Sequence, residues 1–161
     1  MSQNTVRRLE LTVAPSDAGV RVELLLRRKF GLSGTVIRRV KWLEDGILLD
    51  GTRVTTACRP AAGQVLSVRV ADPDGQGDMV PTPGPLDIVY EDGDLLVLNK
   101  PAGLAMHPMS TDLAAPNLAG ALVAYLGEGT VPHFVSRLDK GTSGLLIAAK
   151  SGYVHELLRR A

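Results

Sequence analysis

The sequence predicts an α+β protein in which a linker joins two small domains. Three observations support this prediction. Apolar side chains recur at helical spacing within residues 19–44, they alternate as in strands within residues 66–70, and residues 72–85 carry four prolines and three glycines. Because such a linker cannot bury a core, we place the domains at residues 1–71 and 86–161, with residues 72–85 between them.

Two short helices and a β-hairpin are expected in the first domain. Residues 19–31 form the first helix, and a second helix runs from an N-cap at Ser33 through Glu44. Asp50 and Gly51 separate two apolar stretches and are typical of a two-residue β-turn. Strands are expected at residues 47–49, 53–55 and 66–70.

The second domain is expected to combine strands and helices. Residues 91–94 form a turn between two apolar stretches, Gly127 ends a helix, and Ser151 is a candidate N-cap for a last helix. Strands are expected at residues 86–90, 95–99 and 145–149, and helices at residues 117–126 and from residue 151 onward.

Charge is divided unequally between the two halves of the chain. Residues 1–70 contain 12 Lys and Arg against 6 Asp and Glu, whereas residues 71–161 contain 6 against 11. This asymmetry suggests that the first domain holds a polyanion. The cations expected to contact phosphate groups are Arg27, Arg28, Lys29, Arg38, Arg39 and Lys41. A solvated helix face is the other interpretation of these charges, and Trp42 is expected to be a packing residue rather than a base-stacking one.

Composition excludes several kinds of protein. The single cysteine, Cys58, cannot form an internal disulfide and fits a reducing compartment. Neither a signal peptide nor a membrane span is visible, so we expect a cytoplasmic protein without a membrane partner. The three histidines and one cysteine lack the spacing of metal ligands, so no metal and no other cofactor is expected.

One stretch, residues 133–151, combines a carboxylate, a cation and a turn. Arg137 and Asp139 stand two positions apart at the end of an expected strand, where residues i and i+2 project to the same face. A cation beside a carboxylate keeps that carboxylate ionised. The pair is either a structural ion pair or a reacting group held in a fixed direction, and the pattern alone leaves both open.

The string R-L-D-x-x-T-S-G-L-L, from Arg137 to Leu146, resembles the catalytic motif of the RluA-type RNA pseudouridine synthases. The resemblance implies that Asp139 is the catalytic residue. The residues that it implies as support for the active site are Arg137, Thr142, Ser143 and Gly144. Two positions depart from the commonest pattern, because Ser136 stands where many members have His and Gly141 where an acidic residue is frequent.

Two further stretches resemble parts of the same proteins. The string Y-E-D-x-x-L-L-V-L-N-K-P-A-G-L-x-x-H-P, from Tyr90 to Pro108, resembles the first motif of this family and implies that Lys100 supports the active cleft. Two basic helices followed by a hairpin resemble the S4 RNA-binding domain, which commonly precedes the catalytic domain. Without the resemblance, Lys100 would be a solvent-facing turn lysine and His107 an ordinary loop histidine.

The resemblance implies an enzyme, an RNA pseudouridine synthase that isomerises uridine in structured RNA. Its fold would be a small N-terminal α/β S4-like RNA-binding domain, followed by the N-terminal part of a synthase domain with a mixed or antiparallel sheet. Asp139 would act as nucleophile or as the base that initiates cleavage of the glycosidic bond, and the sequence leaves both open. The implied partner is RNA, with ribosomal RNA expected first and tRNA as the alternative.

In the family, the catalytic domain continues beyond the part matched here, with a base-stacking Tyr and a basic residue that pairs with the catalytic Asp. We therefore do not expect the 161 residues alone to be active, and exposed sheet edges predict poor solubility or self-association. The rival function is a non-catalytic S4-type RNA-binding protein that carries an incomplete synthase domain. Glycoside hydrolysis by paired carboxylates is disfavoured, since no second acid is singled out near Asp139.

Overall fold

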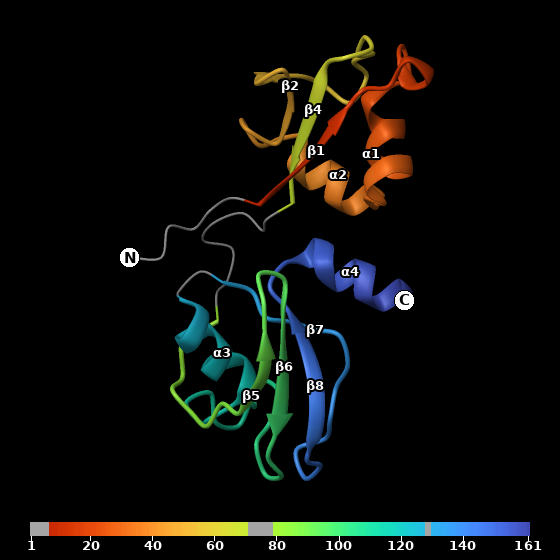
Figure 1. Cartoon of the computed structure of the whole chain (residues 1–161). Coiled ribbons are helices and arrows are strands. Elements are labelled where there is room, and N and C mark those ends of the chain that lie inside the picture. The colour runs from red at the N-terminus through yellow and green to blue at the C-terminus, as the bar shows by residue number, and fades with distance from the viewer. Residues whose placement is uncertain (1–6, 71–78, 128–129) are drawn as a thin grey trace. The chain divides into compact units, whose positions relative to one another are not determined.

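The computed structural model describes residues 7–70, 79–127 and 130–161, and the chain divides into two compact units, residues 1–71 and 72–161 (Figure 1). Each unit combines helices with one four-stranded antiparallel sheet, which confirms the α+β class. The first half of the expected linker, residues 72–78, lies outside the described residues. None of the described helices is long and apolar enough to cross a membrane.

The first unit is a sheet with the strand order β1-β4-β2-β3 and two α-helices beside it (Figure 1). Its elements are β1 (Arg8–Thr12), the short 3-10 helix η1 (Pro15–Asp17), α1 (Val22–Phe30), α2 (Gly34–Val40), β2 (Ile47–Leu49), β3 (Thr52–Arg53) and β4 (Val65–Arg69). Leu25 and Leu26 on the apolar face of α1 and Leu66 and Val68 of β4 are all buried and belong to the core of this unit. Amphipathic helices on one apolar sheet face therefore account for this unit.

Local signals in the sequence fix the helix ends of this unit. Gly31 has the left-handed backbone (φ 67°) that ends α1. The expected N-cap is confirmed, because the Ser33 hydroxyl accepts a hydrogen bond from the Val36 amide. Asp50 and Gly51 both have positive φ angles, as a tight hairpin between β2 and β3 requires.

The second helix is shorter than expected, since α2 ends at Val40 and not at Glu44. Two tight turns follow it, in which the Leu43 amide bonds to the Val40 carbonyl and the Gly46 amide bonds to the Leu43 carbonyl. A Cβ atom on Gly46 would lie 1.8 Å from the Val40 oxygen. The chain thus folds back on the end of the helix, a close approach that only glycine permits.

The second unit is a sheet with the strand order β5-β6-β8-β7. Its elements are β5 (Ile88–Glu91), β6 (Leu95–Lys100), α3 (Leu118–Leu126), β7 (His133–Phe134), β8 (Gly144–Ala149) and α4 (Gly152–Arg160). Leu118 and Leu122 of α3 pack against Leu96 and Leu98 of β6 and Leu146 of β8, which makes the core of this unit. Figure 1 shows α4 at the end of β8, where Ser151 caps it as expected.

The predicted strand before Asp139 is wrong. β7 ends at Phe134, and residues 135–143 form a loop that leads into β8. The backbone carbonyls of Lys140 and Thr142 bond to Lys100 and Gly103 rather than to a partner strand. The loop conformation is therefore set by contacts with a distant part of the chain, which strand periodicity does not detect.

Candidate functional site in the second unit and cationic surface in the first

The antiparallel pairing of β6 with β8 brings the two most distinctive stretches of the sequence together. In this register Lys100, the last residue of β6, lies opposite Gly144, the first residue of β8. The turn that follows β6 therefore contacts the loop that precedes β8. The candidate site is built where these two connections meet.

Lys100 is the buried centre of this arrangement, with a side chain that is 0% exposed. Its ammonium group donates to three backbone carbonyls, those of Thr142 at 2.7 Å, Pro101 at 2.9 Å and Lys140 at 3.2 Å. An ammonium group has three protons to donate, so these bonds satisfy it completely. Lys100 is thus neither the solvent-facing lysine of an ordinary turn nor a free base, but a clamp that holds the loop before β8.

A backbone hydrogen bond reinforces the same contact. The Gly103 amide donates to the Lys140 carbonyl at 2.7 Å, and Gly103 has a φ angle of 90°, which side chains disfavour. Two independent donors therefore hold the loop before β8, namely the side-chain ammonium of Lys100 and the backbone amide of Gly103.

Asp139 lies on the outer side of the clamped loop and is exposed. Its carbonyl accepts a hydrogen bond from the Thr142 amide at 2.9 Å, which closes a turn over residues 139–142. Leu138 packs against the core of the unit, while Arg137 and Asp139 on either side of it are exposed. The anchored leucine and the turn fix the backbone of Asp139, while its side chain is exposed.

Arg137 and Asp139 form no ion pair in the part of the chain that the structure describes. Arg137 instead lies near His107, whose pKa is lowered from its ordinary value by burial and by the positive charge of Arg137. The His107 ring also meets the Phe134 ring edge-on, at 5.5 Å between centroids. The structure therefore brings His107, to which the sequence gave no role in the site, to the same loop as Asp139.

A hollow of about 510 Å³ opens beside this loop. Gly103, His107 and Lys140 line it together with Met109 and Asn117. Of the other expected supporting residues, Thr142 contributes its carbonyl to the Lys100 clamp, Ser143 is exposed, and Gly144 begins β8. Among the described residues, no group of three or more His, Cys, Asp or Glu side chains could hold a metal ion.

The six cations expected in the first unit differ in how they are held. Arg27 pairs with Glu23 at 3.1 Å and Lys29 with Asp17 at 2.9 Å, whereas Arg28 and Arg38 are exposed, and the Arg38 guanidinium reaches the Thr35 hydroxyl at 3.5 Å. The remaining two, Arg39 and Lys41, are half-buried. A Cβ atom on Gly34 would lie 3.2 Å from the Arg27 guanidinium, so Arg27 crosses from α1 to the start of α2.

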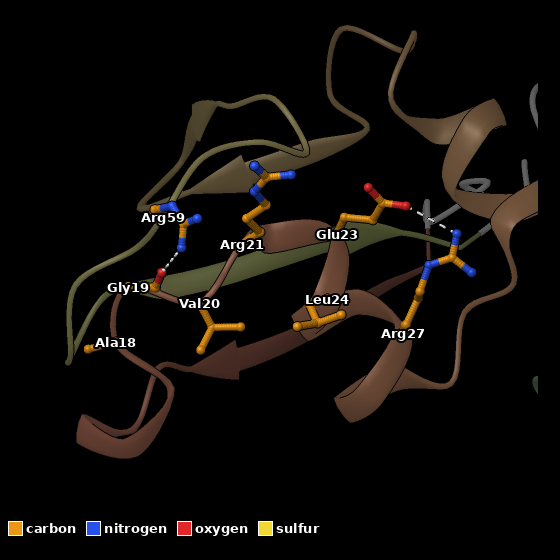
Figure 2. A pocket seen from close by; sticks show the side chains of 8 residues that line it. All are labelled: Ala18, Gly19, Val20, Arg21, Glu23, Leu24, Arg27 and Arg59. Carbon is orange, nitrogen blue, oxygen red and sulfur yellow. Dashed lines mark hydrogen bonds and ion pairs between the residues drawn. The ribbon is translucent and has the colours of Figure 1, made fainter.

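Figure 2 shows a second hollow in the first unit, of about 630 Å³. Arg21, Arg27 and Arg59 surround it, with Val20 and Leu24 as its apolar lining. Arg59 is tied down by a hydrogen bond to the Gly19 carbonyl at 2.6 Å. The sequence did not single out Arg21 or Arg59, because they lie 38 positions apart and only the fold brings them to one hollow.

Comparison with known proteins finds sequences similar to this chain. Residues 94–161 match the family model described as RNA pseudouridylate synthase. The chain is 37% identical to an uncharacterized RNA pseudouridine synthase of Bacillus subtilis, over 73% of this chain and 41% of that protein. It is 33% and 37% identical to the ribosomal large subunit pseudouridine synthases D of Neisseria meningitidis serogroup B and Xylella fastidiosa. Those matches cover 93% and 88% of this chain but only 41% and 43% of the relatives, so the chain spans less than half of their length.

Proposed function

We propose that the chain belongs to the RNA pseudouridylate synthase family, whose model matches residues 94–161, and that it is part of an enzyme that isomerises uridine to pseudouridine in RNA. We propose Asp139 as the catalytic residue. The observation that supports this role is the exposed Asp139 carboxylate on a loop that the buried Lys100 ammonium clamps.

The reaction requires a carboxylate that is held in a defined position relative to the nucleoside. The C1′–N1 bond of the uridine breaks, the uracil turns, and C5 of the same base is joined to C1′; C5 loses its proton and N1 gains one, so no atom is gained or lost overall. The Asp139 carboxylate serves as the nucleophile or as the base that starts bond cleavage. A uridine within a folded RNA must first leave its stack to reach it, and the exposure of Asp139 is compatible with that approach.

In this proposal the first unit is an S4-like domain that holds the RNA. The cations of α1 and α2, together with Arg21 and Arg59 at the second hollow, supply positive charge for phosphate groups. Ribosomal RNA is the proposed substrate because two of the relatives are named as synthases of the large ribosomal subunit, with tRNA as the alternative. The cytoplasm is the proposed compartment, since Cys58 is a free thiol.

The test is a chimera in which residues 94–161 replace the matching segment of the Bacillus subtilis relative. We expect the chimera to form pseudouridine in RNA, and the same chimera with Asp139→Asn to form none. The matched control is Asp112→Asn, because Asp112 is also an exposed aspartate and lies within the swapped segment, unlike Asp87. This control should leave the activity of the chimera unchanged. Pseudouridine formed by the Asp139→Asn chimera at the unaltered rate would refute the catalytic role.

The 161-residue chain is assayed in parallel for RNA binding and for pseudouridine formation. RNA binding without isomerisation by this chain, combined with an active chimera, assigns catalysis to the family segment in the context of a longer protein. RNA binding with an inactive chimera favours the rival function, a non-catalytic S4-type RNA-binding protein.

A further inference from the structure

Trp42 is the only tryptophan of the chain, and it is 76% exposed. It stands in the first of the two turns that follow α2. Val40 before it is buried and Leu43 after it is half-buried, so the apolar residues on both sides pack inward while the indole points to solvent. A large aromatic side chain in this position contributes little to the core, and the expectation that Trp42 is a packing residue is wrong.

The turn that carries Trp42 is well braced. The Leu43 amide closes it by donating to the Val40 carbonyl at 3.0 Å, Gly46 packs against that carbonyl, and the Gly46 carbonyl accepts from the Arg69 amide of β4 at 2.8 Å. The indole is thus presented by a backbone fixed at both ends, which lowers the entropy lost when a ligand stacks on it.

Two cations lie at the turn that carries the indole. The Lys41 ammonium lies over the Trp42 ring at 4.9 Å from its centroid, a cation–π contact. The Arg53 guanidinium reaches the Lys41 carbonyl at 3.5 Å, which brings a second cation to the turn. The Asp45 carboxylate of the second turn is paired with Arg69 at 3.3 Å and with Arg8 at 3.5 Å, so its charge is largely offset.

We propose that Trp42 is a stacking platform for an unpaired nucleobase of bound RNA, with Lys41 and Arg53 holding the adjacent phosphates. One ring face carries the Lys41 ammonium, and the exposure of the side chain leaves the other face for a base. Stacking on an aromatic ring tolerates any base, because every base has a π-face. This inference rests on the proposed RNA binding of the first unit and names a contact within it.

Because Trp42 is the sole tryptophan, the intrinsic fluorescence of the full chain reports on this one position. The chain is titrated with a single-stranded uridine oligomer, with the same oligomer carrying abasic residues, and with inorganic polyphosphate. We expect the uridine oligomer to quench the fluorescence strongly, and the two ligands without bases to bind with little quenching. Anisotropy of dye-labelled oligomer measures the affinity independently.

The Trp42→Ala variant should bind the uridine oligomer about 5- to 150-fold more weakly, the range that corresponds to 1–3 kcal/mol for one stacked base. Trp42→Phe, which keeps an aromatic face, should recover most of that affinity. Val65→Ala is the matched control, since Val65 is also an exposed apolar residue of this unit, and it should bind as the wild type does. The urea midpoint of Trp42→Ala should equal that of the wild type.

Each contrary result has a distinct meaning. Equal quenching by polyphosphate, wild-type affinity of Trp42→Ala, or a large loss of its stability would overturn the stacking role and leave RNA binding by the cations intact. If the wild-type chain binds no RNA in the anisotropy assay, the proposed function of the first unit fails and the stacking role fails with it.

Discussion

Replacing Lys100 by methionine tests whether the buried ammonium holds the loop that carries Asp139. Methionine is unbranched and fills the same channel, but it donates no hydrogen bond. The Pro101 and Thr142 carbonyls then lose the bonds described above, whereas the Lys140 carbonyl keeps its bond from the Gly103 amide. The substitution therefore leaves the Pro101 and Thr142 carbonyls without the Lys100 ammonium as their donor.

The expected loss of stability follows from these two groups. A hydrogen bond to a charged group contributes about 1.5–3 kcal/mol, so the two lost bonds together contribute about 3–6 kcal/mol. Removing the ammonium also removes the cost of burying a charge, which offsets part of this loss. We expect the second unit to lose about 2–4 kcal/mol, a large fraction of the stability of an ordinary domain.

The chain offers separate optical probes for its two units. All three tyrosines, Tyr90, Tyr125 and Tyr153, lie in the second unit, and Trp42 lies in the first. Urea unfolding followed by the tyrosine near-ultraviolet circular dichroism should shift to lower urea in Lys100→Met, while the tryptophan transition stays unchanged. Hydrogen exchange at the Thr142 amide should become faster, because the turn that this amide closes loses its clamp.

Lys140→Met is the matched control, because it makes the same chemical change at an exposed side chain of the same loop. It should shift the stability of the second unit by no more than about 0.5 kcal/mol. If Lys100→Met unfolds at the same urea concentration as Lys140→Met, the three carbonyl bonds do not stabilise the loop and the clamp is refuted.

Two further predictions concern the same unit. Burial and the nearby Arg137 charge lower the pKa of His107 in the folded chain. The His107 imidazole therefore binds a proton more readily in the unfolded chain than in the folded one. The stability of the unit should then fall as pH drops below the ordinary histidine pKa of about 6.5. His107→Gln should show a smaller fall in tyrosine-monitored urea unfolding, and an identical pH dependence in both proteins would contradict this account. Leu145 and Val89, on the sheet face away from α3, are 62% and 57% exposed, so we expect the 161-residue chain to self-associate on a sizing column. Leu145→Lys should shift it toward the monomer, and a wild type that elutes as a monomer would disprove the expectation.

Local signals in the sequence predicted much of the secondary structure. Helical spacing and the capping hydroxyls of Ser33 and Ser151 located helices, and the Asp50-Gly51 pair located the hairpin. Such features depend on neighbours within a few residues, so a single sequence reveals them. β1 was not predicted, although Leu9 and Leu11 alternate with polar residues as in a strand and its side chains are only partly buried.

The candidate site was less predictable, because its geometry depends on contacts between residues far apart in the sequence. Motif resemblance pointed to Asp139 and Lys100, but periodicity placed Asp139 at the end of a strand where the structure has a loop. The burial of Lys100 depends on carbonyls about 40 positions away. A lysine after a strand and before a proline otherwise looks like a surface residue.

The Lys100 clamp also gives a physical reason why the two distinctive stretches occur in one unit. A buried ammonium is tolerated only where acceptors meet all of its protons, and here the loop before β8 provides two of the three. That loop in turn has no ladder partner for those two carbonyls, so it needs the donor that β6 delivers. The end of β6 thus supplies the hydrogen-bond donor, and the loop before β8 supplies the acceptors. Because the contact uses only backbone carbonyls of the loop, the side chains of Arg137, Asp139 and Ser143 remain free to face a substrate.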